Sequence, residues 1–446
     1  MPGYAYLTAD WRKEALRTNL WVAPAALTVA TLALFVVTYS IDRSAYNGQL
    51  ALPSWVLSGT ADAARMVLTT VAAAVITVVG IVFSITIVVL TLASTQFGPR
   101  MLRNFVRDLG TQLTLGAFVA TFCYAVITLV AIGGGPHGDF VPHLSITVTL
   151  VMTLVDVGVL IYFLNHIASM IQLPIVVAKI AGTLAAEISA QEGGRLFGVG
   201  AARGPSCDEL VEQLRVSGAE IRTPHSGYLQ VIRHETLLKV ATAADAVIQL
   251  SYRPGHFLVA GQVMAHVWPA QAADFVEQNL LRGHVTGPYR TLTQDISFGF
   301  DQLVEIALRA LSPAVNDTFT ALTCIDWIGD CLCRISTSWR PQRIRRDATG
   351  HIRVIAYQAD FDRLVERAYE KIRQAADGMP AVLIRQLDSL AKVTEQTPDR
   401  CRRTTLLRQA VQIQRANLRS VPDPDDRADV TRAYEALIAL VKPQTS

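Results

Sequence analysis

The chain of 446 residues is 51% hydrophobic and only 17% charged, which makes it more apolar and less charged than an ordinary soluble domain. Its formal net charge of +3 is too small to indicate a nucleic-acid-binding protein. The apolar residues gather in the first half of the chain, whereas the second half has an ordinary charged composition. We therefore expect a membrane part followed by a water-soluble part.

Four segments are long and apolar enough to cross a bilayer, which takes about 20 residues. They cover residues of about 20–41, 66–97, 112–132 and 144–171. Together they form an expected membrane domain at 20–172, preceded by a short segment at 1–19.

The positions of Lys and Arg predict how these spans are oriented. Cations cluster in the flanks on one side of the membrane, at 12–17, at 100–107 and at Lys179. Short cationic flanks stay on the cytoplasmic side. We therefore expect both chain termini and everything after the fourth span to be cytoplasmic.

The second span carries small and hydroxyl-bearing side chains at heptad spacing along one face. The stripe consists of Thr70, Ala73, Thr77, Gly80, Ser84, Ile87, Thr91 and Ser94. Lipid gives helices little hydrophobic drive to associate, so such a stripe is typical of a face that packs on protein. Two interpretations stay open: plain helix–helix packing with back-bonded hydroxyls, or a helix that lines a polar path in an oligomer. The candidate pore or helix-interface residues are Thr70, Thr77, Gly80, Ser84, Thr91 and Ser94.

The same span is longer than the bilayer requires and has a strong stop signal. Residues 66–97 would extend over roughly 48 Å as a helix, against a hydrocarbon core of about 30 Å. We expect the helix to leave the inner leaflet at the polar residues Ser94, Thr95 and Gln96. Gly98 can then leave helical dihedrals, and Pro99 cannot continue the hydrogen-bond ladder.

Polar and ionisable groups interrupt the fourth span. Asp156 is near its centre, and Asn165 and His166 lie toward its inner end. A carboxylate in lipid is costly unless it faces protein or water. Helical spacing places Asp156 and His166 on one face, which is compatible with an ion or proton relay. The alternative is a buried polar anchor, with Asp156 satisfied by hydroxyls of the second span.

Three cytoplasmic segments are expected after the membrane domain. They are linker helices with a Gly-rich loop at 173–222, a β-rich module at 223–290 and a helical domain at 291–446. Short alternating runs and Gly-containing turns predict the strands, and a small β-barrel would accommodate them. The expected fold class is therefore an α-helical membrane protein with four transmembrane helices plus a cytoplasmic α+β region.

The helical domain contains one conspicuous break, at 312–317. Asp317 is well placed to cap the amino terminus of the helix that follows. A binding loop built on Asn316 and Asp317 is the alternative. Further helices are expected at 361–376, 381–393, 401–417 and 427–441.

The sequence shows none of the usual catalytic signatures. A P-loop, an HExxH motif and a GxSxG motif are all missing, and the six cysteines lack the spacing of a zinc site or a disulfide framework. We expect no enzymatic activity, no cofactor and no bound metal.

Several of these stretches together resemble a bacterial membrane-protein family known as domain of unknown function 2254. The resemblance lies in Gln96, Phe97, Gly98, Pro99 and Arg100, in Arg253, Pro254 and Gly255, in 298–310, and above all in Ser312, Pro313, Asn316 and Asp317. Two residues depart from the family pattern: Thr318 stands where proline is common, and Asn165 where a second histidine commonly precedes His166. The second departure weakens a paired-histidine metal site. The resemblance implies a bacterial inner-membrane protein with four spans and a cytoplasmic domain, and it implies no established activity.

Two functions from different classes fit these features. The hydroxyl stripe and the overlong second span favour an oligomeric channel or gated conduit for ions or small solutes, with a cytoplasmic regulatory domain. The alternative is a membrane-anchored sensor or scaffold whose cytoplasmic domain binds a partner. Expected partners are the lipid bilayer, further copies of the same chain, and an unidentified cytoplasmic protein or small ligand, but not nucleic acid.

Overall fold

The computed structural model describes residues 21–97, 108–135, 138–192 and 203–441. The chain divides into two compact units, Met1–Gln172 and Leu173–Ser446, each with its own internal contacts. The two units are treated separately below.

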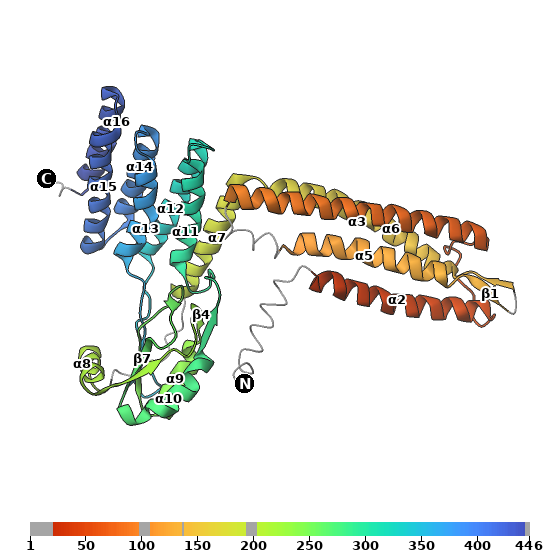
Figure 1. Cartoon of the computed structure of the whole chain (residues 1–446), viewed down its shortest axis with the longest axis horizontal. Coiled ribbons are helices and arrows are strands. Elements are labelled where there is room, and N and C mark those ends of the chain that lie inside the picture. The colour runs from red at the N-terminus through yellow and green to blue at the C-terminus, as the bar shows by residue number, and fades with distance from the viewer. Residues whose placement is uncertain (1–20, 98–107, 136–137, 193–202, 442–446) are drawn as a thin grey trace. The chain divides into compact units, whose positions relative to one another are not determined.

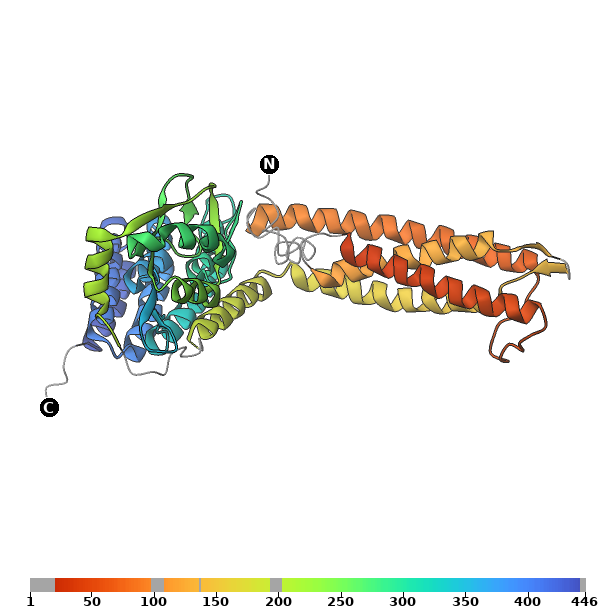
Figure 2. The same ribbon diagram turned by 90° about the horizontal axis from the view of Figure 1, so that it is seen from below.

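The described part of the amino-terminal unit contains four long helices. They are α2 (Val22–Tyr46), α3 (Ala61–Phe97), α5 (Leu109–Val130) and α6 (His143–Met170). The helices run lengthwise side by side, and a hairpin of β1 (Gly133–Gly135) and β2 (Gly138–Phe140) joins α5 to α6 (Figures 1 and 2). Helix α5 has the most extensive contacts with the other three and is the central helix of the bundle.

Five helices among the described residues are long and apolar enough to cross a membrane, one more than the sequence predicts. The fifth is α7 (Leu173–Glu192), which belongs to the second unit. There it contacts α11 (Ile296–Ala310) and α12 (Thr318–Thr337). Its buried apolar residues are Val176, Val177, Ile180, Ala181, Leu184 and Ile188. The apolar face of α7 thus has protein partners of its own, and the number of spans stays a prediction.

The described part of the second unit contains two open β-sheets. Their strands are β3 (Ala219–Arg222), β4 (Gly227–Ile232), β5 (Val247–Leu250), β6 (Phe257–Leu258), β7 (Val263–Trp268), β8 (His284–Gly287), β9 (Ile344–Arg346) and β10 (Ile352–Ile355). One sheet has the order β3-β7-β5-β10-β9 and the other β6-β4-β8. The strand predicted at 227–232 is confirmed, but the small barrel is not. Two strands of the larger sheet come from 344–355, a stretch expected to lie in a helical domain, and β10 pairs with β5 in parallel.

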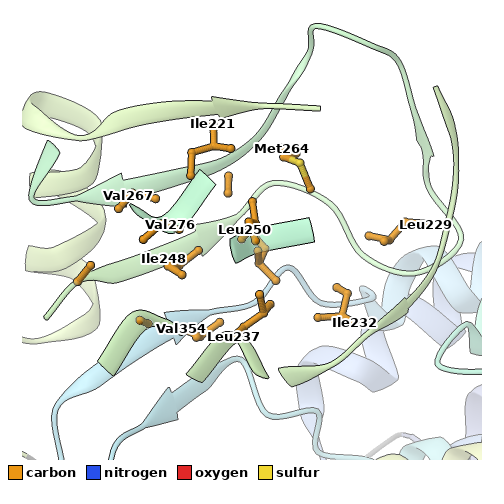
Figure 3. Close-up of a cluster of buried hydrophobic side chains, with 14 of the residues drawn as sticks. Ile221, Leu229, Ile232, Leu237, Ile248, Leu250, Met264, Val267, Val276 and Val354 are labelled. Atoms are coloured by element: carbon orange, nitrogen blue, oxygen red, sulfur yellow. The ribbon is translucent and has the colours of Figure 1, made fainter. Parts of the chain in front are cut away.

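Alternation along these strands builds a core on each face of the larger sheet. The helices concerned are α8 (Cys207–Ser217), α9 (His234–Ala243) and α10 (Ala273–Leu280). Ile248 packs in the cluster that contains Leu237 of α9 and Val276 of α10 (Figure 3). Its neighbour Val247 packs in the cluster that contains Leu210 of α8. Successive strand residues point to opposite faces, so adjacent residues of β5 hold different helices.

Three of the four carboxy-terminal helices begin directly after an aspartate that caps them, and the fourth begins at a proline. The four are α13 (Phe361–Ala375), α14 (Pro380–Gln396), α15 (Arg400–Ser420) and α16 (Pro424–Ala439), which confirms the helices predicted there to within a few residues. The side chains of Asp360, Asp399 and Asp423 each accept a backbone N–H of the first turn. These caps satisfy donors that the helix itself leaves unpaired.

A tight turn at Arg253, Pro254 and Gly255 brings two distant parts of the second unit together. Gly255 has a φ of +93°, and a Cβ at this position would overlap the carboxylate of Asp295. Asp295 in turn caps α11 by accepting from the backbone N–H of Phe298. The turn therefore requires glycine both for its backbone conformation and for the close approach of the Asp295 side chain.

We predict that Gly255→Ala destabilises the second unit strongly. Gly261→Ala is a matched control, because Gly261 has a similar φ of +84° but no atom within 4 Å of an added Cβ. The control should cost about 1–2 kcal/mol for its left-handed backbone. Gly255→Ala should cost roughly 2 kcal/mol more because of the clash. Unfolding of the purified full chain measures both variants, and equal losses would contradict the predicted role of the contact with Asp295.

Candidate functional site

The hydroxyl stripe of α3 faces away from the other helices of its own chain. Thr70, Thr77, Gly80, Ser84 and Thr91 are all exposed in the amino-terminal unit. A Cβ at Gly80 would meet no atom within 4 Å. The stripe therefore does not serve helix packing within the bundle, which was the simpler of the two interpretations of the sequence.

The opposite face of α3 makes the packing contacts. Leu68 and Val82 are completely buried, and Val75 and Val89 are 4% and 5% exposed. These apolar residues lie on the side that contacts α5. Helix α3 thus buries an apolar face in its own bundle, and the hydroxyl stripe is turned outward together with exposed apolar residues such as Ile81, Phe83 and Val88.

Each exposed hydroxyl of the stripe donates to its own helix. Thr70, Thr77, Ser84 and Thr91 donate to the carbonyl oxygens four residues earlier, at 2.8–2.9 Å. The hydroxyl proton is used in this bond, so the outward lone pairs of the oxygens can only accept. The stripe accordingly presents a row of acceptors.

The end of this span lies only partly within the described residues. The backbone remains helical through Gln96 and Phe97, but the side chains of Ser94, Gln96 and Phe97 are not described. Gly98, Pro99 and Arg100 lie outside the described residues. The expected helix stop and cationic elbow therefore stay predictions.

Asp156 is buried within the bundle, at 4% exposed. Its hydrogen-bond partner is the hydroxyl of Thr121 on α5, whereas a partner on the second span was expected. The face of α3 that carries its hydroxyl stripe is turned outward, so those side chains do not supply the bond. The Oδ2 atom has no hydrogen-bond partner among the described residues.

His166 pairs with Asp108 rather than with Asp156. Its Nε2 lies 2.7 Å from Asp108 Oδ2, and its ring stacks on Tyr162 with centroids 5.4 Å apart. Asp108 also caps α5 by accepting from the backbone N–H of Thr111. A Cβ at Gly110 would approach His166 Nε2 to 2.8 Å, so a glycine there makes room for the ring. This pair links α5 to α6.

The neighbouring residues do not complete a relay along α6. Asn165 is exposed, next to the His166 pair. Ten residues of helix, roughly 15 Å, separate His166 from Asp156. The structure thus gives the two ionisable residues different partners, Asp108 for one and Thr121 for the other.

A buried polar network near the start of α6 was not anticipated from the sequence. The carboxylate of Asp42 on α2 accepts from the backbone N–H groups of Leu144 and Ser145, at 2.8 and 3.0 Å, and from Ser145 Oγ at 2.7 Å. The residue before α6, Pro142, supplies no side-chain cap. Asp42 therefore caps a helix that lies 102 residues further along the chain.

Two further hydroxyls extend this network to α5. Thr38 Oγ1 lies 3.1 Å from Ser145 Oγ and 2.7 Å from the hydroxyl of Tyr124. Thr38, Asp42, Ser145 and Tyr124 are all buried. The network joins α2, α5 and α6, and it leaves α3 outside.

The second unit holds a compact cluster of arginines and aspartates beside the Arg253 turn. Arg290 bridges Asp295 at 2.8 Å and Asp301 at 2.6 Å. Arg367 also pairs with Asp301, at 2.6 Å, and Arg253 lies 3.6 Å from Asp295. These ion pairs connect the Arg253 turn with α11 and α13.

His256 lies beside these cations. Burial, together with the positive charges of Arg253, Arg290 and Arg367, lowers the pKa of His256 to about 4. The imidazole is therefore neutral at pH 7. A cavity of about 370 Å³ borders His256, Arg253 and Arg367.

The motif at 312–317 forms the turn between α11 and α12. Asp317 accepts from the backbone N–H of Thr320 at 3.1 Å and caps α12, as predicted. Asn316 has a φ of +49°, and its backbone N–H donates to Ser312. Pro313 and Asn316 are exposed. Helix capping thus accounts for Asp317, and a binding role for the loop stays a prediction.

The described residues contain no group of three or more His, Cys, Asp or Glu side chains arranged to hold a metal ion. In the amino-terminal unit, the carboxylate of Asp42 accepts three hydrogen bonds from Leu144 and Ser145.

We predict that Asp42→Ala destabilises the amino-terminal unit by about 2–3 kcal/mol, because it leaves buried backbone donors of α6 unpaired. Asp62→Ala is the matched control, since the Asp62 side chain is 94% exposed on α3. The control should change the free energy of unfolding by less than about 0.5 kcal/mol. Reversible unfolding in mixed micelles gives both values, and a loss at Asp42 no larger than at Asp62 would refute the cap.

Comparison with known proteins assigns the chain to a family. The model of the family described as predicted membrane protein, DUF2254, matches residues 17–392. Uncharacterised proteins of Mycobacterium bovis and Mycobacterium tuberculosis are each 32% identical to it over 448 residues, which cover 96% of this chain and 82% of theirs. No solved structure matches the chain. The protein thus belongs to the DUF2254 family of predicted membrane proteins, the same family that its sequence motifs resemble.

Proposed function

We propose that the protein is an oligomeric conduit for ions or small solutes, in which α3 helices from several copies line the path. The observation that carries this proposal is the outward orientation of the hydroxyl stripe, which lies opposite the face that α3 buries in its own bundle. Small residues and hydroxyls allow two helices to pack closely, and lipid gives no such partner. In a ring of copies around an axis, the α3 helices would supply that partner for each other.

The spacing of the stripe supports this arrangement. Thr70, Thr77, Ser84 and Thr91 follow each other every seven residues. A seven-residue repeat drifts on a straight helix, and it stays on one side only when helices wind around each other with a left-handed twist. A bundle of α3 helices with such a twist keeps all four hydroxyls on its axis.

The bonding of the stripe favours cations or neutral polar solutes over anions. Its hydroxyl protons are donated to the backbone, so the oxygens facing a path would only accept. Rings of oxygen acceptors can replace part of the hydration shell of a cation.

The proposed membrane topology has four spans, α2, α3, α5 and α6, in a bacterial inner membrane, with both termini in the cytoplasm. The positions of Lys and Arg support this orientation. The contacts of α7 with α11 and α12 support its place in the cytoplasmic unit. A fluorescent protein fused after Ser446 should therefore fluoresce, and alkaline phosphatase fused there should be inactive. The opposite pattern would refute the topology.

We predict that the purified protein, reconstituted in liposomes, conducts K⁺ better than Cl⁻. Ser84→Leu and Thr91→Leu should reduce the flux by about tenfold, because they place branched apolar groups on the path. Ser84→Thr keeps the hydroxyl and should keep the flux. Phe83→Leu changes an exposed residue at the same depth, about 100° further round the helix, and should also leave the flux unchanged.

One result would end this proposal. It is the absence of flux under voltage, tension and pH steps when the protein is shown to be inserted and oligomeric. The alternative, a membrane-anchored sensor or scaffold, predicts that result and leaves binding to the second unit intact. The charged cavities of that unit favour this second candidate.

A further inference from the structure

A second cavity of the carboxy-terminal unit has a volume of about 360 Å³, and its wall includes the charged or titratable residues Glu187, His234, Arg253 and Arg345. Elements from across the unit line it: the end of α7, the start of α9, the Arg253 turn, strand β9 and the segment after β10. Cavities of this volume fall in the range that holds small organic ligands. It lies beside the other cavity, with which it shares Arg253 and Tyr357.

Two nitrogen atoms of this wall are withdrawn from solvent and have no hydrogen-bond partner among the described residues. They are Nδ1 of His234 and Nε of Arg345. A buried polar group without a partner costs about 1–3 kcal/mol, and native structures contain few of them. Because both residues line the cavity, their side chains are the candidate ligand contacts in its wall.

The charge around these atoms indicates the sign of that ligand. Burial and the positive charge of Arg345, with a contribution from His284, lower the pKa of His234 to about 3. Burial also lowers the pKa of Arg345, and the carboxylate that acts against this effect, Glu235, is exposed. This end of the cavity is therefore short of negative charge.

The acidic residue in the wall, Glu187, makes its hydrogen bonds with other groups. Glu187 on α7 accepts from the backbone N–H of Gln294 at 2.9 Å and from the side chain of Gln191 at 3.2 Å. Gln191 also accepts from the indole N–H of Trp339. Both bonds to Glu187 are accepted by its Oε1 atom, and the bond from Gln294 joins α7 to the segment before α11.

We propose that this cavity binds a small organic molecule through an oxyanion group, a phosphate or a carboxylate, held by Arg345 and His234. The planar guanidinium of arginine suits such groups because it offers paired N–H donors. The volume exceeds what a bare oxyanion needs, so the rest of the molecule would lie along Ile232, Trp339 and Pro341.

Binding here would act on the helix that follows the last membrane span. Glu187 and Gln191, in the last turns of α7, form part of the wall, and α7 begins three residues after α6 ends. A ligand that orders this wall stabilises one position of α7. This regulatory role rests on the proposed conduit, whereas the binding itself does not.

Titration calorimetry on the detergent-solubilised full chain tests the proposal, with inorganic phosphate, citrate and AMP as probes and adenosine as the neutral counterpart of AMP. We expect saturable binding of at least one anionic probe and none of adenosine. Phosphate and AMP against citrate distinguish the two oxyanion chemistries. Arg345→Gln should weaken binding by about tenfold or more, and Arg345→Lys by less, since it keeps the charge but loses the paired donors.

The matched control is Arg343→Gln. It removes the same charge two residues away on the chain, from an exposed side chain that does not line the cavity, and its affinity should equal that of the unmodified protein. Unchanged unfolding of each variant without ligand shows that the fold persists. The proposal is overturned if no anionic probe binds, if adenosine binds as well as AMP, or if Arg345→Gln and Arg345→Lys both leave affinity unchanged. Because this experiment measures no transport, it stands apart from the flux assay.

Discussion

The arrangement of the membrane unit depends on one buried acceptor, the carboxylate of Asp42. A helix leaves its first backbone N–H groups without partners, and lipid cannot supply them. Asp42 takes two of these donors at the start of α6, and the hydroxyls of Ser145, Thr38 and Tyr124 carry the network on to α5. Three helices are thus joined through polar contacts. Among its described side chains, α3 packs on the bundle through apolar residues such as Leu68 and Val82, and its hydroxyl stripe is exposed.

The two units differ in how completely their buried polar side chains are paired. In the amino-terminal unit, polar side chains that hold the bundle are satisfied within it, with Asp156 Oδ2 as an exception among the described residues. In the second unit, most charges of the Arg253 cluster are paired, but the cavity at Arg345 and His234 is not balanced in the same way. We therefore propose transport at a surface between copies of α3, and ligand binding at the cavity wall of the second unit.

Local patterns in the sequence predict much of the fold. Periodicity and caps give the long helices, the helices from α13 to α16 and the role of Asp317, since these depend on residues a few positions apart. The heptad stripe of α3 is also visible, but a stripe defines a face and does not say what that face meets. The capping role of Asp42 cannot be predicted from the sequence, because capping signals are recognised only next to the helix they cap and Asp42 caps a helix 102 residues away. The partners of Asp156 and His166 are equally non-local.

Distance along the chain also explains the missed sheet. The pairing of β5 with β10 joins residues about 100 positions apart, and no turn signal connects them. A short strand can be predicted between His351 and Asp360, where β10 lies, but so short a strand does not indicate which strand it pairs with. The parallel pair becomes visible only when the whole unit is assembled.

That pairing has a consequence for the order in which the protein is made. Domains fold as their residues emerge, starting from the amino terminus. The central strand of the larger sheet, β5, must wait for β10, which is synthesised after α11 and α12. The expected spans are all complete before then. The hydrophobic helices are thus committed to the bilayer while the sheet still lacks a strand, and the unit that is proposed to bind a ligand matures on an already anchored chain.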